Sequence, residues 1–318
     1  MPEAKRDRYG RYLLPNPETG KETAWTRATT LAETLEDQYG LTKWKMRNAI
    51  WGVAQRTDLL ALAQSATLED DKQLDELCEQ GLVVAGSGAR ANMGTALHKF
   101  TERLDRGEKF VVPSEYAPDL EAYLQVKKLG RIQTAPAFVE RILVVPEFNV
   151  AGTTDRIVRV DGEMVCIADL KTGGDVLKYS QGKIAIQLAV YAHATAMWNQ
   201  VSGVYEAVPP VDQDRGLVIH VPAGEARADL YWVDLVQGWQ AANLAYKVRQ
   251  WRKNKKLLSK IDLENAALSS GKGAASGIHR GSDHRLRNSE GNRLHCMVVV
   301  AGLFTRTGCR VVLRDCAD

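Results

Sequence analysis

The stretch that decides the fold is Val165-Cys166-Ile167-Ala168-Asp169-Leu170-Lys171, an apolar strand that ends in an acid and a lysine. Two residues apart on a strand, Asp169 and Lys171 project from the same face. A second strand just upstream carries Asp155. Between the two strands, Asp161-Gly162 is a hairpin signal, because type I′ turns need positive φ. Pairing across that turn is expected to bring Asp155 level with Asp169.

Two carboxylates and an ammonium would then meet at one end of a sheet. Carboxylate oxygens are the ligands that hard divalent cations prefer. A lysine beside such an ion can orient a water molecule and stabilise developing phosphate charge. The alternative is that these are surface charges at a strand end. Against it, Asp169 follows a run that should be buried, where an unpaired carboxylate is costly.

Helices are expected on both sides of this hairpin, and the fold class is α/β (α+β) with a mixed central sheet flanked by helices. An extra helical region precedes the core. The expected elements are a polar extended arm over 1–30, helices over 30–81, a glycine-rich loop over 85–94, a helix over 95–105, strands over 138–148, 153–160 and 163–171, a helix over 180–198, strands over 216–221 and 229–235, and a helix over 235–260.

These elements suggest three regions, which are residues 1–90, a core over 91–265 and a tail over 266–318. The chain of 318 residues has 45% hydrophobic and 25% charged residues, which excludes a disordered chain, a collagen-like repeat and a coiled-coil rod. The net charge is +3, of which residues 268–318 contribute +4, so the remainder is almost neutral. Any nucleic-acid binding must therefore use a local patch.

The location expected from the sequence is the cytoplasm. No apolar run approaches the ~20 residues that span a bilayer, and no signal peptide is expected behind the first five residues. The five cysteines are an odd and scattered set that does not form a disulfide framework.

Two helices carry further candidate residues. His98 and Glu102 are four apart in the helix over 95–105, so they share one face. Gln187 and Tyr191 have the same spacing in the helix over 180–198. Taken alone, either pair would be an ordinary packed or solvated helix face. A phosphate-binding loop over 86–95 is excluded, because it lacks the lysine that reaches the phosphates.

Taken together, four motifs in this order resemble the RecB-like branch of the PD-(D/E)XK nuclease superfamily. The chain looks most like the bacteriophage-encoded exonucleases grouped with the CRISPR-associated RecB-like nucleases. The motifs stand here as Gly94-Thr95-Ala96-Leu97-His98, Gly152-Thr153-Thr154-Asp155, Asp169-Leu170-Lys171-Thr172-Gly173 and Gln187-Leu188-Ala189-Val190-Tyr191. Each is weak alone, and the resemblance by motif covers residues 90–200.

The resemblance implies a restriction-endonuclease-like core and a metal-dependent DNA nuclease. The expected activity is hydrolysis of phosphodiester bonds at DNA ends, in phage replication or recombination within the host cytoplasm, with one or two Mg²⁺ or Mn²⁺ ions. The implied roles are metal ligation by His98, Asp155, Asp169 and the Leu170 carbonyl, water positioning by Lys171, support of Lys171 or backbone contact by Gln187 and Tyr191, and a secondary acid at Glu102. Glu147 is a weaker candidate that is as readily structural.

DNA is the expected partner, together with an unidentified recombination or replication partner. The acid-free run at the end of the last helix is either a solvated helix end or a phosphate contact. Its central residues are Arg252, Lys253, Lys255 and Lys256. An iron–sulfur cluster, present in some relatives, is not expected, because the cysteine spacing does not fit. The alternative function is a catalytically silent DNA-binding recombination module with the same fold.

Overall fold

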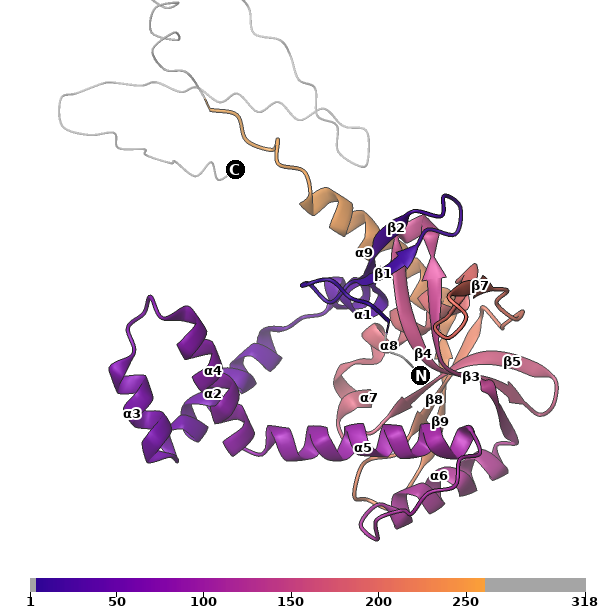
Figure 1. Ribbon diagram of the computed structural model, residues 1–318, viewed down its shortest axis with the longest axis horizontal. Coiled ribbons are helices and arrows are strands. Elements are labelled where there is room, and N and C mark those ends of the chain that lie inside the picture. The colour runs from indigo at the N-terminus through magenta and orange to yellow at the C-terminus, as the bar shows by residue number, and fades with distance from the viewer. Residues whose placement is uncertain (1–3, 261–318) are drawn as a thin grey trace, which may run out of the picture. The chain divides into compact units, whose positions relative to one another are not determined.

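A single mixed sheet forms the centre of the chain in the computed structural model, which describes residues 4–260 (Figure 1). The described residues up to Leu257 form one compact unit. The expected tail over 266–318 therefore lies outside the described residues, as do three of the five cysteines. The strands are β1 Tyr12–Pro15, β2 Glu22–Arg27, β3 Ile132–Val145, β4 Val150–Val160, β5 Met164–Lys171, β6 Ala196–Asn199, β7 Val204–Glu206, β8 Arg215–His220 and β9 Asp229–Asp234.

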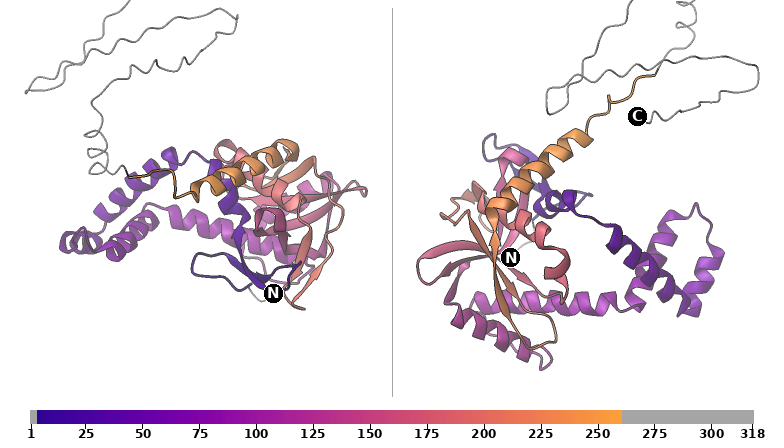
Figure 2. Two further views of the ribbon diagram at one scale, coloured as in Figure 1. Left: turned by 90° about the horizontal axis from the view of Figure 1, so that it is seen from above. Right: turned by 180° about the vertical axis from the view of Figure 1, so that it is seen from behind.

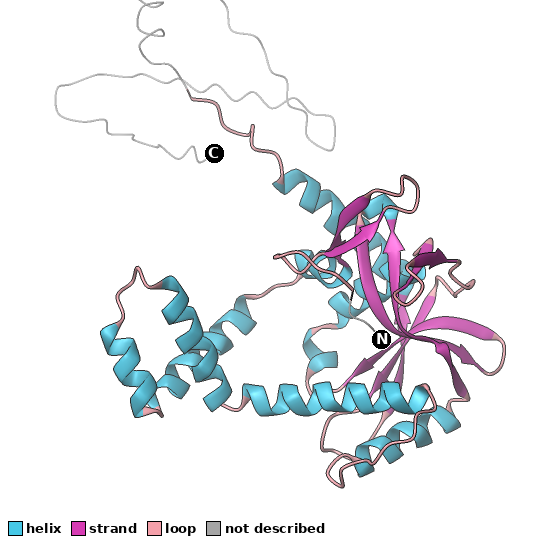
Figure 3. Cartoon of the chain, in the orientation of Figure 1, coloured by secondary structure: helices cyan, strands magenta, loops and turns pink. Residues whose placement is uncertain are grey.

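The strands, magenta in Figure 3, follow the order β7-β6-β3-β4-β5-β8-β9 across the sheet. Strands β3, β4 and β5 form an antiparallel meander, and β8 joins β5 in parallel. The expected hairpin turn is present, since Asp161 has φ 52° and Gly162 has φ 77°. The mixed central sheet flanked by helices is thus confirmed.

Helices cover both faces of this sheet (Figure 2). One hydrophobic cluster contains side chains of α1 (Ala28–Ala32), α8 (Gln181–Ala192) and α9 (Leu235–Arg252). The cluster on the other face contains side chains of α5 (Ser87–Asp105) and α6 (Ala117–Leu129). Because side chains alternate along a strand, Ile167 belongs to the first cluster and Ala168 to the second. The same alternation directs Asp169 toward the α8 side.

The region before the core contains a helical group and a hairpin. Helices α2 (Tyr39–Ala54), α3 (Thr57–Ser65) and α4 (Asp71–Val84) follow a 3₁₀ turn over Glu33–Leu35. At the α2–α4 crossing, a Cβ on Gly52 would lie 1.9 Å from the Gly81 carbonyl oxygen, so only glycine permits this approach. The expected helices over 30–81 are confirmed.

Two expectations near the N-terminal side of the site are wrong. The residues expected as an extended arm form the antiparallel β1–β2 hairpin, and β2 adds in parallel to β4. The expected loop over 85–94 belongs to α5, which begins at Ser87 after Gly86 with φ 87°. The glycine-rich composition suggested a loop, but Gly94 lies within the helix, where the absence of a side chain permits close packing against Thr172.

Other expected helix ends also moved. The expected helix over 180–198 ends at Ala192, and its last residues instead form β6, which pairs with β3. Helix α9 ends at Arg252, eight residues before the expected end. The Asn254 side chain accepts a hydrogen bond from the Lys256 amide at 2.9 Å, a local turn that competes with the helix. Helices α6 and α7 (Val176–Tyr179) and strand β7 were not foreseen.

Within residues 4–260, none of the helices combines the length and apolar character needed to cross a membrane.

Candidate active site

The β4–β5 hairpin brings the two predicted carboxylates together. Arg156 pairs with Ala168, so continuing the register by one residue places Asp155 opposite Asp169. Asp155 Oδ2 accepts a hydrogen bond of 2.7 Å from the Leu170 amide. The Asp155 side chain is therefore anchored on the end of β5, beside the second acid.

Asp169 and Lys171 form a close ion pair. Lys171 Nζ lies 2.5 Å from Asp169 Oδ2, and the Asp169 side chain is 4% exposed. Apart from this ion pair, the buried Asp169 Oδ2 has no hydrogen-bond partner among the described residues. An anionic oxygen withdrawn from water and incompletely satisfied in this way can accept a cation.

Burial sets the protonation of this pair. It raises the pKa of Asp169 to about 6, with Lys171 opposing the shift and Asp155 adding to it. Burial alone would lower the pKa of Lys171, but the charges of Asp169 and Asp155 outweigh burial and raise it. Lys171 is consequently a charged ammonium at neutral pH, held against the two acids.

His98 reaches the same point from α5. Its Nδ1 lies 3.8 Å from Asp155 Oδ2. Burial lowers the pKa of His98, while Asp155 and a hydrogen bond with the Leu170 backbone oppose that shift. A neutral imidazole keeps a nitrogen lone pair for a metal ion. His98 and Asp155 therefore both contact the backbone of Leu170, the residue that follows Asp169 on β5.

The predicted donors have the chemistry that a hard or borderline divalent ion requires, but their side chains are spaced more widely than a metal site needs. Two carboxylates, an imidazole and a backbone carbonyl suit Mn²⁺ and Mg²⁺, and Asp169 Oδ2 is held only by its ion pair with Lys171 among the described residues. Across residues 4–260, however, no three His, Cys, Asp or Glu side chains are gathered closely enough to hold a metal ion as they stand.

Gln187 and Tyr191 lie behind this point on α8. Gln187 Nε2 donates to Tyr191 Oη at 3.1 Å, and both side chains are buried. Burial raises the pKa of Tyr191 well above its ordinary value, so the phenol stays protonated. With Gln187 only 8% exposed, the pair is placed to support the site from within the core instead of lining its surface.

The motif glycines are contact points between motifs. A Cβ on Gly94 would lie 2.6 Å from Thr172 Oγ1. A Cβ on Gly152 would lie 2.7 Å from Tyr191 Cε1 and 2.8 Å from its Oη. The first motif thus packs on the third, and the second on the fourth. Four segments that are distant in sequence are joined pairwise around one centre.

Gly152→Ala tests this packing. The added methyl group overlaps Tyr191 and the Ala28 Cβ, which is 2.9 Å away, and neither neighbour has a flexible end that can move aside. We expect a loss of about 1–3 kcal/mol in the free energy of unfolding, measured by urea denaturation. Gly182→Ala is the matched control, because nothing lies within 4 Å of the added Cβ there. Equal stability of the two variants would contradict the contact.

Two further acids lie near Asp155, and only one was foreseen. Glu102 pairs with Arg106 at 3.6 Å, and burial raises the pKa of this acid. Glu140 is opposite Asp155 on β3, beside a register shift, and has φ 55°. Burial raises the pKa of Glu140 to about 8, and the charges of Asp155 and Glu102 add to the shift. A lone acid inside an apolar strand was the signal in the sequence for Glu140.

A buried ionic cluster on the other face of β4, which no sequence pattern indicates, holds α5 in place. Arg156 is fully buried; it contacts Asp105 and donates to Thr101 Oγ1 at 2.8 Å. Tyr123 Oη donates to Asp105 at 2.6 Å. His98, Thr101 and Asp105 follow one another along the same side of α5. This cluster therefore holds the helix that presents His98.

Two predicted groups lie away from this centre. Glu147 is exposed in the 3₁₀ turn Pro146–Phe148, about 17 Å along β4 from the level of Asp155. Arg252 is the last residue of α9, and Lys253, Lys255 and Lys256 follow it, all exposed. Their contact with DNA stays a prediction.

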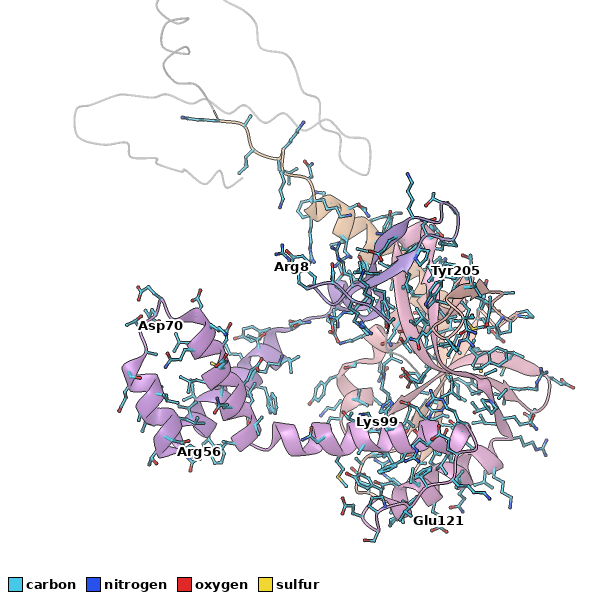
Figure 4. All side chains as sticks on the ribbon, in the orientation of Figure 1. Arg8, Arg56, Asp70, Lys99, Glu121 and Tyr205 are labelled. Carbon is cyan, nitrogen blue, oxygen red and sulfur yellow. The ribbon has the colours of Figure 1, made fainter. Side chains whose placement is uncertain are left out.

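A cavity of about 850 Å³ opens beside His98. It lies between the start of α5 and the loop after β5, and Figure 4 labels Lys99, the residue that follows His98 on α5. The lining includes Gly94, His98, Thr172, Gly173, Asp175 and Glu225. Of the predicted site residues, only His98 lines this cavity.

No protein-family model matches the chain, and no curated protein matches it.

Proposed function

We propose that the chain is a metal-dependent deoxyribonuclease with a RecB-like PD-(D/E)XK core, which hydrolyses phosphodiester bonds at DNA ends. The observation that carries this proposal is the meeting of Asp155 and His98 at the Leu170 backbone, with Asp169 opposite Asp155 and Lys171 in contact with Asp169. The order of elements supports it, since the four motifs lie in turn on α5, on β4, at the end of β5 and on α8.

His98, Asp155, Asp169 and the Leu170 carbonyl would hold the Mg²⁺ or Mn²⁺ ion. When bound, the ion supplies positive charge that stabilises the phosphate as it gains charge in the transition state. Asp169 and Asp155 provide the anionic oxygens, and Asp169 Oδ2 must exchange Lys171 Nζ for the ion. Glu102 and Glu140, which face Asp155, are the acids available for a second ion.

Lys171 has the role of positioning the attacking water. Its charged ammonium can donate hydrogen bonds to a water oxygen and to a phosphate oxygen on the face that it shares with Asp169. Gln187 and Tyr191 fix the α8 side of the site through their mutual hydrogen bond. The Arg156–Asp105 pair fixes the α5 side. Each reacting group is therefore held by a buried second contact.

The alternative function, a catalytically silent DNA-binding module, does not explain why the core keeps buried acids. Asp169 is buried beside a second carboxylate, and burial raises its pKa to about 6. Replacing buried charged groups by well-packed apolar ones is often neutral or stabilising. A chain without a reaction to perform would gain stability by losing these acids. Metal-dependent cleavage of end-labelled DNA by the purified chain tests the two functions against each other.

His98→Ala should shift the metal preference of that activity. Imidazole suits Mn²⁺ better than Mg²⁺, so we expect a larger loss of cleavage in Mn²⁺ than in Mg²⁺. The measurement is the ratio of initial rates in the two metals. Lys99→Ala, at the next and exposed position, should leave the ratio unchanged. Equal losses in both metals, or none, would mean that His98 is structural.

A further inference from the structure

Helix α2 has an exposed face of aromatic and cationic side chains that nothing in the proposed active site uses. Its buried side, with Ala49 and Gly52, packs on α4. The opposite side, which we call the α2 face, consists of residues spaced by one, three and four, as one helix face requires. These residues are Lys43, Trp44, Arg47, Ile50 and Trp51, all exposed.

The indole rings are unusually open to solvent. Trp44 is 41% exposed, Trp51 54% and Ile50 71%. Large apolar side chains gathered on one exposed face mark a surface that another molecule covers. Trp44 and Trp51 are two helical turns apart, about 10.5 Å along the axis, which equals roughly three stacked nucleotides at about 3.4 Å each.

Charge is segregated within this helical group. Helix α2 has three cations, Lys43, Lys45 and Arg47, and no acid. Helix α4, against which it packs, has four acids and a single lysine. Figure 4 labels Arg56 and Asp70, which precede α3 and α4. A polyanion would therefore be attracted to the α2 face and repelled from the exposed side of α4.

We propose that the α2 face binds single-stranded DNA, with bases stacked on Trp44 and Trp51 and phosphates paired with Lys43 and Arg47. This inference rests on the proposed nuclease function and names the form of DNA that the enzyme engages. Base stacking on protein aromatics requires unpaired bases, because the ring faces are covered inside a duplex. The combination of open indoles with acid-free positive charge thus selects a single strand over a duplex.

The test is binding of a fluorescein-labelled 20-nucleotide oligo(dT) to the full chain in chelator, so that no cleavage takes place. Trp51→Ala should weaken binding about tenfold, at every salt concentration and with an unchanged salt slope. Arg47→Gln should reduce the slope of log affinity against log salt by about 0.7. An abasic oligonucleotide of the same length, which keeps the phosphates, should bind more weakly to the wild type and be insensitive to Trp51→Ala.

The control is an exposed tryptophan beside an arginine outside the α2 face. Trp232 on β9 is 50% exposed, with the Arg215 guanidinium 5.4 Å from its ring. Trp232→Ala and Arg215→Gln should leave oligo(dT) affinity within twofold of the wild type. Circular dichroism confirms that each variant is folded, and Trp44→Ala provides an independent second variant on the α2 face.

Oligo(dT) affinity that is unchanged in both Trp44→Ala and Trp51→Ala would overturn the proposal. The proposal would also be overturned if the wild type sedimented as a dimer and these variants as monomers while DNA affinity stayed intact. The α2 face would then be an interface between copies of the chain. Because the assay contains no metal, its outcome is independent of catalysis. Stacking-dependent binding without cleavage in any metal would refute only the nuclease proposal. Cleavage without such binding would refute only the proposal that the α2 face binds single-stranded DNA.

Discussion

Asp169→Asn is expected to reduce DNA cleavage by about a thousandfold, the upper range for loss of one transition-state contact. The amide keeps the volume of the carboxylate but removes the anionic oxygen that would bind the metal. Initial rates of release from end-labelled DNA at saturating Mg²⁺ measure the effect. DNA affinity in chelator should stay within a fewfold of the wild type.

The fold should survive this change. Burial raises the pKa of Asp169 to about 6, so the folded state already disfavours its charge, and a neutral amide relieves that cost. We expect a loss of about 1 kcal/mol or less, roughly 2–4 °C in Tm for a unit of this size. Asp161→Asn, in the exposed turn at the other end of β5, is the matched control and should keep full activity. Full activity of folded Asp169→Asn protein would refute the site.

Lys171→Ala is expected to lower turnover by about a hundredfold, the low end for a group that handles a reacting proton or water. Metal affinity should be unchanged or tighter, because Lys171 Nζ occupies Asp169 Oδ2 at 2.5 Å and competes with the ion. Calorimetric titration with Mn²⁺ measures the affinity, and single-turnover rates at saturating metal measure the chemistry. Turnover should therefore fall without a loss of metal affinity.

Lys178→Ala is the control for this variant, since Lys178 lies on α7, seven residues further along the chain, outside the proposed site. Metal affinity that collapses in Lys171→Ala while turnover at saturating metal stays normal would show that the lysine organises the ligands and has no part in the reaction. Loss of both together would point to a folding defect, which thermal unfolding would detect.

The central hairpin could be predicted because its signals are local. Short runs rich in valine and isoleucine define β4 and β5, and Asp161-Gly162 supplies the positive φ that their turn requires. Register then follows from counting, and it correctly places Asp155 opposite Asp169. The shared face of Asp169 and Lys171 follows from strand periodicity alone.

The remaining parts of the site depend on packing between distant segments. Gly94 looked like a loop residue, yet it is a helix position that lets Thr172 approach. Glu140 enters the site through a register shift in β3, which no residue pattern specified. Arg156 contacts Asp105, which is 51 residues away in the sequence. Such contacts appear only once the sheet has brought the helices together.

Metal dependence of cleavage is the most direct test of the central claim. Purified chain is incubated with end-labelled single- and double-stranded DNA while Mg²⁺ or Mn²⁺ is titrated from zero, with chelator as the blank and Asp169→Asn protein as the check on contaminating nucleases. The account predicts a saturable, metal-dependent release of short products from DNA ends, absent in chelator and in the variant. Intact DNA at every metal concentration, or cleavage that persists in chelator or in the variant, would contradict it.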